Sequence, residues 1–130
     1  MVNLDRIVSF AKTYKNLKEV LNDHKLAALG DAYINFAYSL ALSNRKGQPS
    51  GAKVQGNVLA QAFKKSGLRE YMQSRINRHM LADAAEALTV YAWLNNHIKL
   101  EECVAILSKA DDPVEGFAQL LSTIKCKVKL

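Results

Sequence analysis

Apolar residues recur at three- and four-residue spacing along most of this 130-residue chain. An α-helix has 3.6 residues per turn, so this spacing gathers apolar side chains on one helical face. The pattern predicts helices in six segments: Leu4 to Ala11, Leu26 to Ala41, Val54 to Phe63, Leu81 to Leu94, Leu100 to Leu107 and Phe117 to Leu121. The sequence therefore predicts an all-α fold, a helical bundle.

Polar, turn-forming residues separate these segments. Pro49 and Pro113 both lie in polar surroundings that are typical of turns. Residues 43–53 combine glycine, proline, serine and cations, which predicts an exposed, mobile loop. Residues 124–130 alternate like a strand, but without a partner strand they are interpreted as a basic end prone to fraying.

The size and composition fit one globular domain spanning residues 1–130. Hydrophobic residues make up 49% of the chain and charged residues 23%, which is ordinary for a folded domain. No apolar run is long enough to span a membrane, so we expect a cytoplasmic protein. Cys103 and Cys126 show no zinc-ligand spacing and no disulfide framework, and both are interpreted as small hydrophobic residues; a bridge between them stays open.

The chain is basic, with a net charge of +6 and a pI of about 9.4. Such a charge attracts polyanions and favours nucleic acid as a partner. The alternative interpretation is a charged surface that only keeps the protein in solution.

Asp83 and Glu86 are three residues apart in a segment that is apolar nearly all round. On a helix both carboxylates project from one face, and the apolar surroundings predict that this helix is buried. Buried carboxylates are costly unless they pair with cations or coordinate a metal. The segment therefore predicts either salt-bridged acids or a metal site.

Asp31 adds a third carboxylate in a second apolar helix segment, directly after Gly30. Glycine destabilises a helix interior by about 1 kcal/mol relative to alanine, so a close helix contact beside Asp31 is expected. Small residues in both segments would let the two helices approach and the three carboxylates share a metal. Together the three acids favour a metal-binding site.

These residues carry a resemblance to a known family. LAALGDAYINFAYSLAL resembles the signature helix of ribonuclease III, and LADAAEALTVYAWL resembles that family's second motif. VQGNVLAQAFKKSGL, between them, is similar to the intervening helix. The resemblance covers about residues 23–95 and is strongest to the short archaeal ribonuclease III-like proteins.

The resemblance implies a single ribonuclease III-type endonuclease domain without a separate double-stranded-RNA-binding domain. Asp31, Asp83 and Glu86 would hold Mg²⁺, for which Mn²⁺ can substitute, and double-stranded RNA would be the substrate. The expected products carry 5′-phosphate and 3′-hydroxyl ends with short 3′ overhangs. The resemblance also implies a homodimer with one site for each RNA strand.

The chain departs from the signature at three positions. His24 and Ala27 stand where the family has two further glutamates, and Ala28 stands where it has an aromatic plug for the dimer partner. The mini-ribonuclease III branch also lacks the glutamate at the Ala27 position and is still a nuclease. His24 lies two turns before Asp31 and is a possible accessory group near a phosphate or water; a capping or surface histidine is the alternative.

Seven cations are candidate phosphate contacts: Arg45, Lys46, Lys53, Lys64, Lys65, Arg75 and Arg78. For Lys64 and Lys65 a solvated helix face is an equally good interpretation. The alternative function is a non-cleaving protein that binds double-stranded RNA with the same fold. A helical DNA-binding or protein-interaction module is a third possibility, although no recognition-helix pattern supports it.

Overall fold

The computed structural model describes Val8, Phe10 and residues 12–129. This part of the chain forms six α-helices, one 3₁₀ turn and no strand, which confirms the all-α prediction. In chain order the elements are α2 (Leu17–Leu21), α3 (His24–Lys46), α4 (Gly56–Lys65), η1 (Leu68–Tyr71), α5 (Arg78–Leu94), α6 (Leu100–Lys109) and α7 (Pro113–Lys127).

The helices expected from the sequence and these elements differ at both ends of the chain. The helix predicted from Leu4 to Ala11 falls mostly outside the described residues; Val8 and Phe10 are described and are not helical. The short helix α2 was not predicted, because five residues carry too little periodicity. The interpretation of residues 124–130 as a strand-like, fraying end is wrong. Helix α7 continues to Lys127, because the buried Ile124 extends the apolar face of this helix by one more turn.

Side-chain caps set where the two longest helices begin. The Asp23 carboxylate accepts hydrogen bonds from the backbone N–H groups of Lys25 and Leu26, so α3 begins at His24. The Asn77 side chain accepts from the N–H of Met80 and starts α5 in the same way. Gly47 ends α3 with a φ of +72°, a left-handed conformation that glycine adopts without strain.

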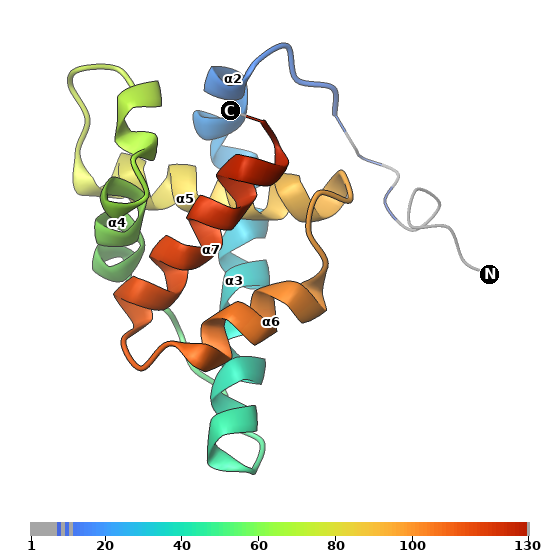
Figure 1. The fold of residues 1–130 in the computed structure, drawn as a ribbon. Helices are drawn as coiled ribbons and strands as arrows, with labels where there is room; N and C mark the ends of the chain where they lie inside the picture. The colour runs from blue at the N-terminus through green and yellow to red at the C-terminus, as the bar shows by residue number, and fades with distance from the viewer. Residues whose placement is uncertain (1–7, 9, 11, 130) are drawn as a thin grey trace.

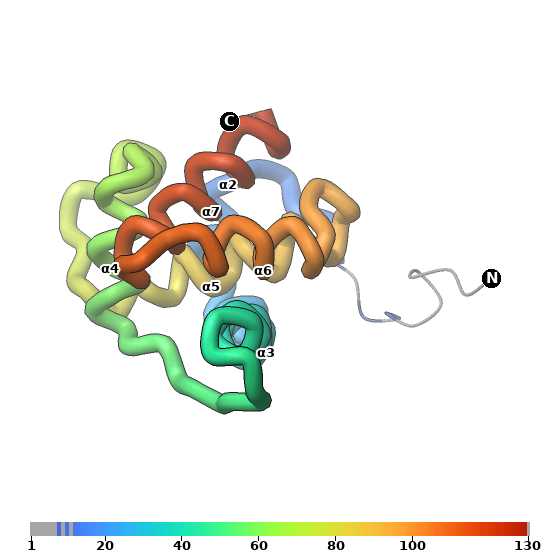
Figure 2. The backbone as a smooth tube through the Cα atoms, turned by 60° about the horizontal axis from the view of Figure 1, so that its bottom comes forward, coloured from blue at the N-terminus to red at the C-terminus, as the bar shows by residue number. Residues whose placement is uncertain are grey.

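Helix α5 is the centre of the molecule and runs across α3 (Figure 1). Helix α4 packs on α5 and α7, and α6 packs on α3 and α7. In the view of Figure 2, which looks nearly along α3, the other long helices all lie on one side of it. The site described below lies where α3 and α5 cross.

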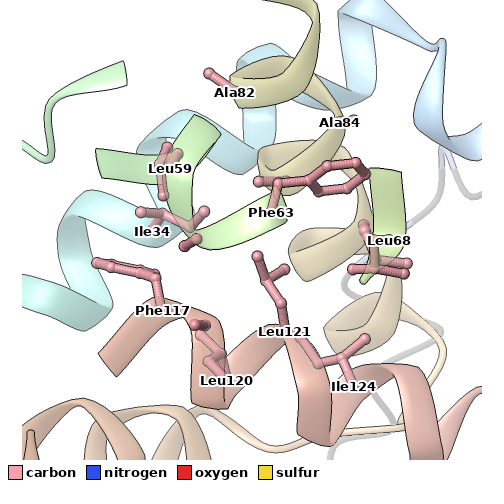
Figure 3. Packing of buried hydrophobic residues seen from close by; sticks show 14 of the residues in the cluster. Ile34, Leu59, Phe63, Leu68, Ala82, Ala84, Phe117, Leu120, Leu121 and Ile124 are labelled. Carbon is pink, nitrogen blue, oxygen red and sulfur yellow. The ribbon is translucent and has the colours of Figure 1, made fainter. Parts of the chain in front are cut away.

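The hydrophobic core lies between α4, α5 and α7 (Figure 3). Phe63 of α4 is fully buried, and Phe117, Leu121 and Ile124 of α7 are at most 1% exposed. Each such side chain contributes roughly 1.5–3 kcal/mol by leaving water. This core fixes α5 in place and leaves one end of it, near its N-terminus, open toward solvent.

The segment predicted as a mobile loop is only partly a loop. Residues 43–46 belong to α3, and the following stretch is hydrogen-bonded back to that helix. The Ser43 hydroxyl accepts from the N–H of Ser50 (2.8 Å) and the Ser39 hydroxyl accepts from the N–H of Ala52 (2.9 Å). These bonds anchor the second half of the segment.

Both cysteines are free thiols. Cys103 is fully buried beside the Tyr33 hydroxyl, and burial raises the pKa of its thiol. Cys126 is exposed on α7, so the interpretation as a small hydrophobic residue holds for Cys103 and is wrong for Cys126. In the described part of the chain, no helix has both the length and the apolar character that crossing a membrane requires.

Candidate active site

Helices α3 and α5 touch at Gly30. A Cβ atom built on Gly30 would overlap the backbone carbonyl of Glu86, so only glycine lets the two helices come this close. The close contact predicted beside Asp31 is therefore present, and its partner is the helix that carries Asp83 and Glu86. The crossing brings together carboxylates that are far apart in the sequence.

Asp31, Asp83 and Glu86 line one open cleft of about 320 Å³ between these helices. The Asp31 and Asp83 side chains are about two-fifths exposed, at 41% and 38%. Glu86 is 9% exposed and lies at the floor. The expectation of burial is thus met by Glu86 alone, while the two aspartates lie at the mouth of the cleft.

Glu86 has a strongly raised pKa. Burial, a hydrogen bond with Asp31 and the negative charges of Asp31 and Asp83 together raise the pKa of Glu86 to about 8. Without a further cation, a second negative charge beside Asp31 is unfavourable, so Glu86 holds its proton at neutral pH. A divalent cation would remove this penalty.

A histidine and a lysine contact the two aspartates. His24 Nδ1 lies 3.1 Å from Asp83 Oδ2, and Lys53 Nζ lies 3.5 Å from Asp31 Oδ2. His24 is the exposed first residue of α3, and it contacts an acid of the site although 59 residues separate the two. The histidine predicted as an accessory group therefore lines the cleft.

Asn35 is a site residue that the sequence interpretation missed. Its amide Nδ2 donates to Asp31 Oδ1 at 3.2 Å, and its Oδ1 accepts from the N–H of Val54 at 2.7 Å. Asn35 thus joins Asp31 to the backbone of the segment that carries Lys53. The four-residue spacing from Asp31 on the same helical face was a signal that could have found it.

His79 was missed as well. It lies in the first turn of α5, lines the cleft, and precedes Asp83 by four residues. That spacing puts both side chains on one helical face. The start of α5 thus carries an imidazole beside the carboxylates.

A second, larger hollow of about 570 Å³ lies beside the N-terminal half of α3. Apolar and aromatic groups such as Leu26, Leu29 and Tyr91 line it. The carboxylate in its wall, Asp23, caps α3 and accepts a hydrogen bond from the Tyr14 hydroxyl. The cleft with Asp31, Asp83 and Glu86 is therefore the better candidate for chemistry.

Comparison with known proteins identifies the family. A family model described as Ribonuclease III matches residues 24–127, from the first residue of α3 to the last of α7. The chain belongs to the ribonuclease III family. A search of curated proteins gives no match. Membership in this family supports a general function for this ribonuclease III protein, that of an endoribonuclease acting on RNA.

The positions that depart from the ribonuclease III signature lie on the α3 side of the cleft. Ala27 is buried, at 3% exposure, and puts a methyl group where the signature has a carboxylate. Ala28 is exposed at the rim. His24 lies one turn earlier and contacts Asp83.

The acids of the cleft are the right kind of ligand for a hard divalent ion, which prefers carboxylate oxygen. Burial and the neighbouring Asp31 and Asp83 raise the pKa of Glu86 because they disfavour its anion, and such an ion would offset this effect. Among residues 12–129, however, no three acidic, imidazole or thiol groups already stand in a metal-binding arrangement. Asp31, Asp83 and Glu86 could hold a metal once the His24 and Lys53 contacts give way.

The predicted RNA-binding cations differ in their surroundings. Lys53 lines the cleft, and Arg75 and Arg78 are exposed just before and at the start of α5. Arg45 donates to the Ala110 carbonyl and pairs with Asp111 at 3.2 Å, and Lys46, Lys64 and Lys65 are exposed, Lys65 pairing with Glu115. Of the seven, Lys53 alone is among the residues that line the cleft, and the RNA-binding role of all seven stays a prediction.

Proposed function

We propose that this protein is a metal-dependent endoribonuclease that cleaves double-stranded RNA by phosphodiester hydrolysis. The observation that carries the proposal is the contact of α3 and α5 at Gly30, which brings Asp31, Asp83 and Glu86 into one cleft of a ribonuclease III protein. Three oxygen-donating acids in a chain with a net charge of +6 suit a divalent ion and a phosphate backbone together.

Asp31, Asp83 and Glu86 would hold Mg²⁺, or Mn²⁺ in its place. When bound, such an ion polarises the phosphodiester and lowers the pKa of a water molecule so that it becomes a nucleophile at neutral pH. Glu86 must release its proton to act as a ligand, which links metal binding to proton release. His24 and His79, at the rim, are placed to donate to phosphate oxygens.

We propose a homodimer whose two clefts each cut one strand of an RNA duplex. The products would carry 5′-phosphate and 3′-hydroxyl ends with short 3′ overhangs. Lys53, Arg75 and Arg78 lie in or near the cleft, whereas the other candidate cations would extend the contact along the RNA: Arg45, Lys46, Lys64 and Lys65. A-form RNA would be recognised by shape and 2′-hydroxyls more than by sequence.

Cleavage of an end-labelled RNA duplex tests the proposal directly. We expect staggered cuts with Mg²⁺ or Mn²⁺, none with EDTA, and a loss of at least about a hundredfold in rate for Asp83→Asn, because one charged ligand is removed. Glu101→Gln is the matched control, since it also removes one negative charge, but from an exposed residue in the first turn of α6, and should leave the rate unchanged. An Asp83→Asn variant as active as the control would refute the site.

The alternative function is a non-cleaving protein that binds double-stranded RNA. It is favoured by Ala27 in the cleft and by the contacts that His24 and Lys53 already make with the aspartates. Duplex RNA that shifts on a gel but stays intact with either metal would support this alternative and contradict the nuclease proposal.

A further inference from the structure

Three polar side chains on one face of α3 hold the segment that carries Lys53. Asn35, Ser39 and Ser43 follow one another at four-residue spacing, and they bond the backbones of Val54, Ala52 and Ser50 respectively. The partner order is reversed, so the segment runs antiparallel to the helix. The register of this segment against α3 is therefore fixed, and with it the backbone position of Lys53.

From that position Lys53 reaches Asp31. Its ammonium group lies 3.5 Å from Asp31 Oδ2, while the Asn35 amide occupies Asp31 Oδ1 at 3.2 Å. Both oxygens of this carboxylate are thus in use. Lys53 is nevertheless 70% exposed, and its flexible stem lets the ammonium group move while the backbone stays bonded to α3.

We propose that Lys53 is an exchangeable counter-ion of the cleft, which neutralises Asp31 until a divalent ion binds there and then contacts an RNA phosphate. This inference rests on the proposed function, because it assumes that Asp31 is a metal ligand. An ammonium group and a divalent ion repel each other and compete for the same oxygen, so binding of the ion displaces Lys53. The displaced cation is then free at the mouth of the cleft, where the RNA backbone would lie.

The exchange couples the binding of the metal ion to the binding of RNA. Because a divalent ion releases Lys53 for RNA, it should strengthen RNA binding, and RNA should strengthen metal binding by the same factor. Lys53 would therefore weaken metal binding in the free protein and strengthen RNA binding. A lysine that contacts phosphate far from Asp31 would leave the metal affinity unchanged.

The test is a titration of the full chain with Mn²⁺. The paramagnetic resonance signal of the free ion measures how much Mn²⁺ is bound. We expect Lys53→Met to bind Mn²⁺ about three- to tenfold more tightly than the unaltered protein, and Lys53→Arg to remain close to it. Lys127→Met is the matched control: it also breaks an exposed ion pair, with Glu102 at 3.2 Å, but at the end of α7. Its Mn²⁺ affinity should not change.

A double-mutant cycle then ties the effect to Asp31. In an Asp31→Asn background, Lys53→Met should no longer tighten Mn²⁺ binding, because the contested carboxylate is gone. An unaltered protein that binds Mn²⁺, with an unchanged or weaker affinity in Lys53→Met, would overturn this inference alone. An unaltered protein that binds no Mn²⁺ would overturn the metal site and this inference with it. Since Lys53 is mostly exposed, each variant should keep the circular dichroism spectrum of the parent.

Discussion

At the scale of single residues, Glu86 is where stability and the proposed function oppose each other. It is 9% exposed and lies near two other carboxylates, so its charged form is unfavourable in the metal-free fold. A protein selected for stability alone would place an apolar or amide side chain here. A strongly raised pKa in a cleft is typical of a functional group.

Glu86→Gln should stabilise the metal-free protein at high pH. The folded state binds the Glu86 proton more tightly than the unfolded state, since the pKa is about 8 against an ordinary 4.5. The stability due to this proton is fully present below about pH 4.5 and is lost as the pH rises through 8. The amide mimics the protonated acid, so we expect a gain of about 1–3 kcal/mol at pH 9 and almost none at pH 4.

Urea unfolding in EDTA at the two pH values measures this difference. Glu101→Gln is the matched control, because Glu101 is exposed on the first turn of α6. A gain for Glu86→Gln of the same size at pH 4 and pH 9 would contradict the raised pKa as its cause.

At the scale of elements, the decisive contact is backbone against backbone. Gly30 of α3 meets the carbonyl of Glu86 on α5, and a side chain at this point would have to push two long helices apart. The same displacement would move Asp31 away from Glu86. The close packing of α3 on α5 is therefore a condition of both the fold and the cleft.

Gly30→Ala should lower the free energy of unfolding by about 2 kcal/mol or more, although alanine favours helix. The overlap with the Glu86 backbone exceeds the propensity gain of about 1 kcal/mol. Gly51→Ala is the control, because a Cβ on Gly51 meets nothing within 4 Å. Thermal melting compares the two, and a Gly30→Ala variant as stable as the control would show that the helices can separate without cost.

The sequence predicted the long helices and their contact because both leave local signals. The 3.6-residue period marks α3 and α5, and a glycine within α3 signals the close approach. The bonds from Asn35 to Val54 and from His24 to Asp83 could not be predicted, since they join segments 19 and 59 residues apart. Which of the three acids is buried was also beyond the pattern, because it depends on how far along the crossing each carboxylate lies.

At the scale of the whole molecule, a basic protein carries a concentrated negative site. The net charge is +6, yet Asp31, Asp83 and Glu86 lie in one cleft. The positive field attracts RNA, whereas the cleft is a local exception that a divalent ion would neutralise. An ion that binds only the folded state must shift the folding equilibrium of the whole chain.

Mn²⁺ should therefore raise the melting temperature, and more so at pH 9 than at pH 6. At a free concentration about a hundredfold above its Kd, an ion that binds only the folded state adds about 2.7 kcal/mol, or about 10 °C for a domain of this size. The effect grows with pH because at pH 6 the ion must also displace the Glu86 proton, whose pKa is about 8. KCl at matched ionic strength controls for screening, and Asp83→Asn should lose most of the shift. A shift that persists in Asp83→Asn, or that is the same at both pH values, would place the stabilising ion somewhere other than this cleft.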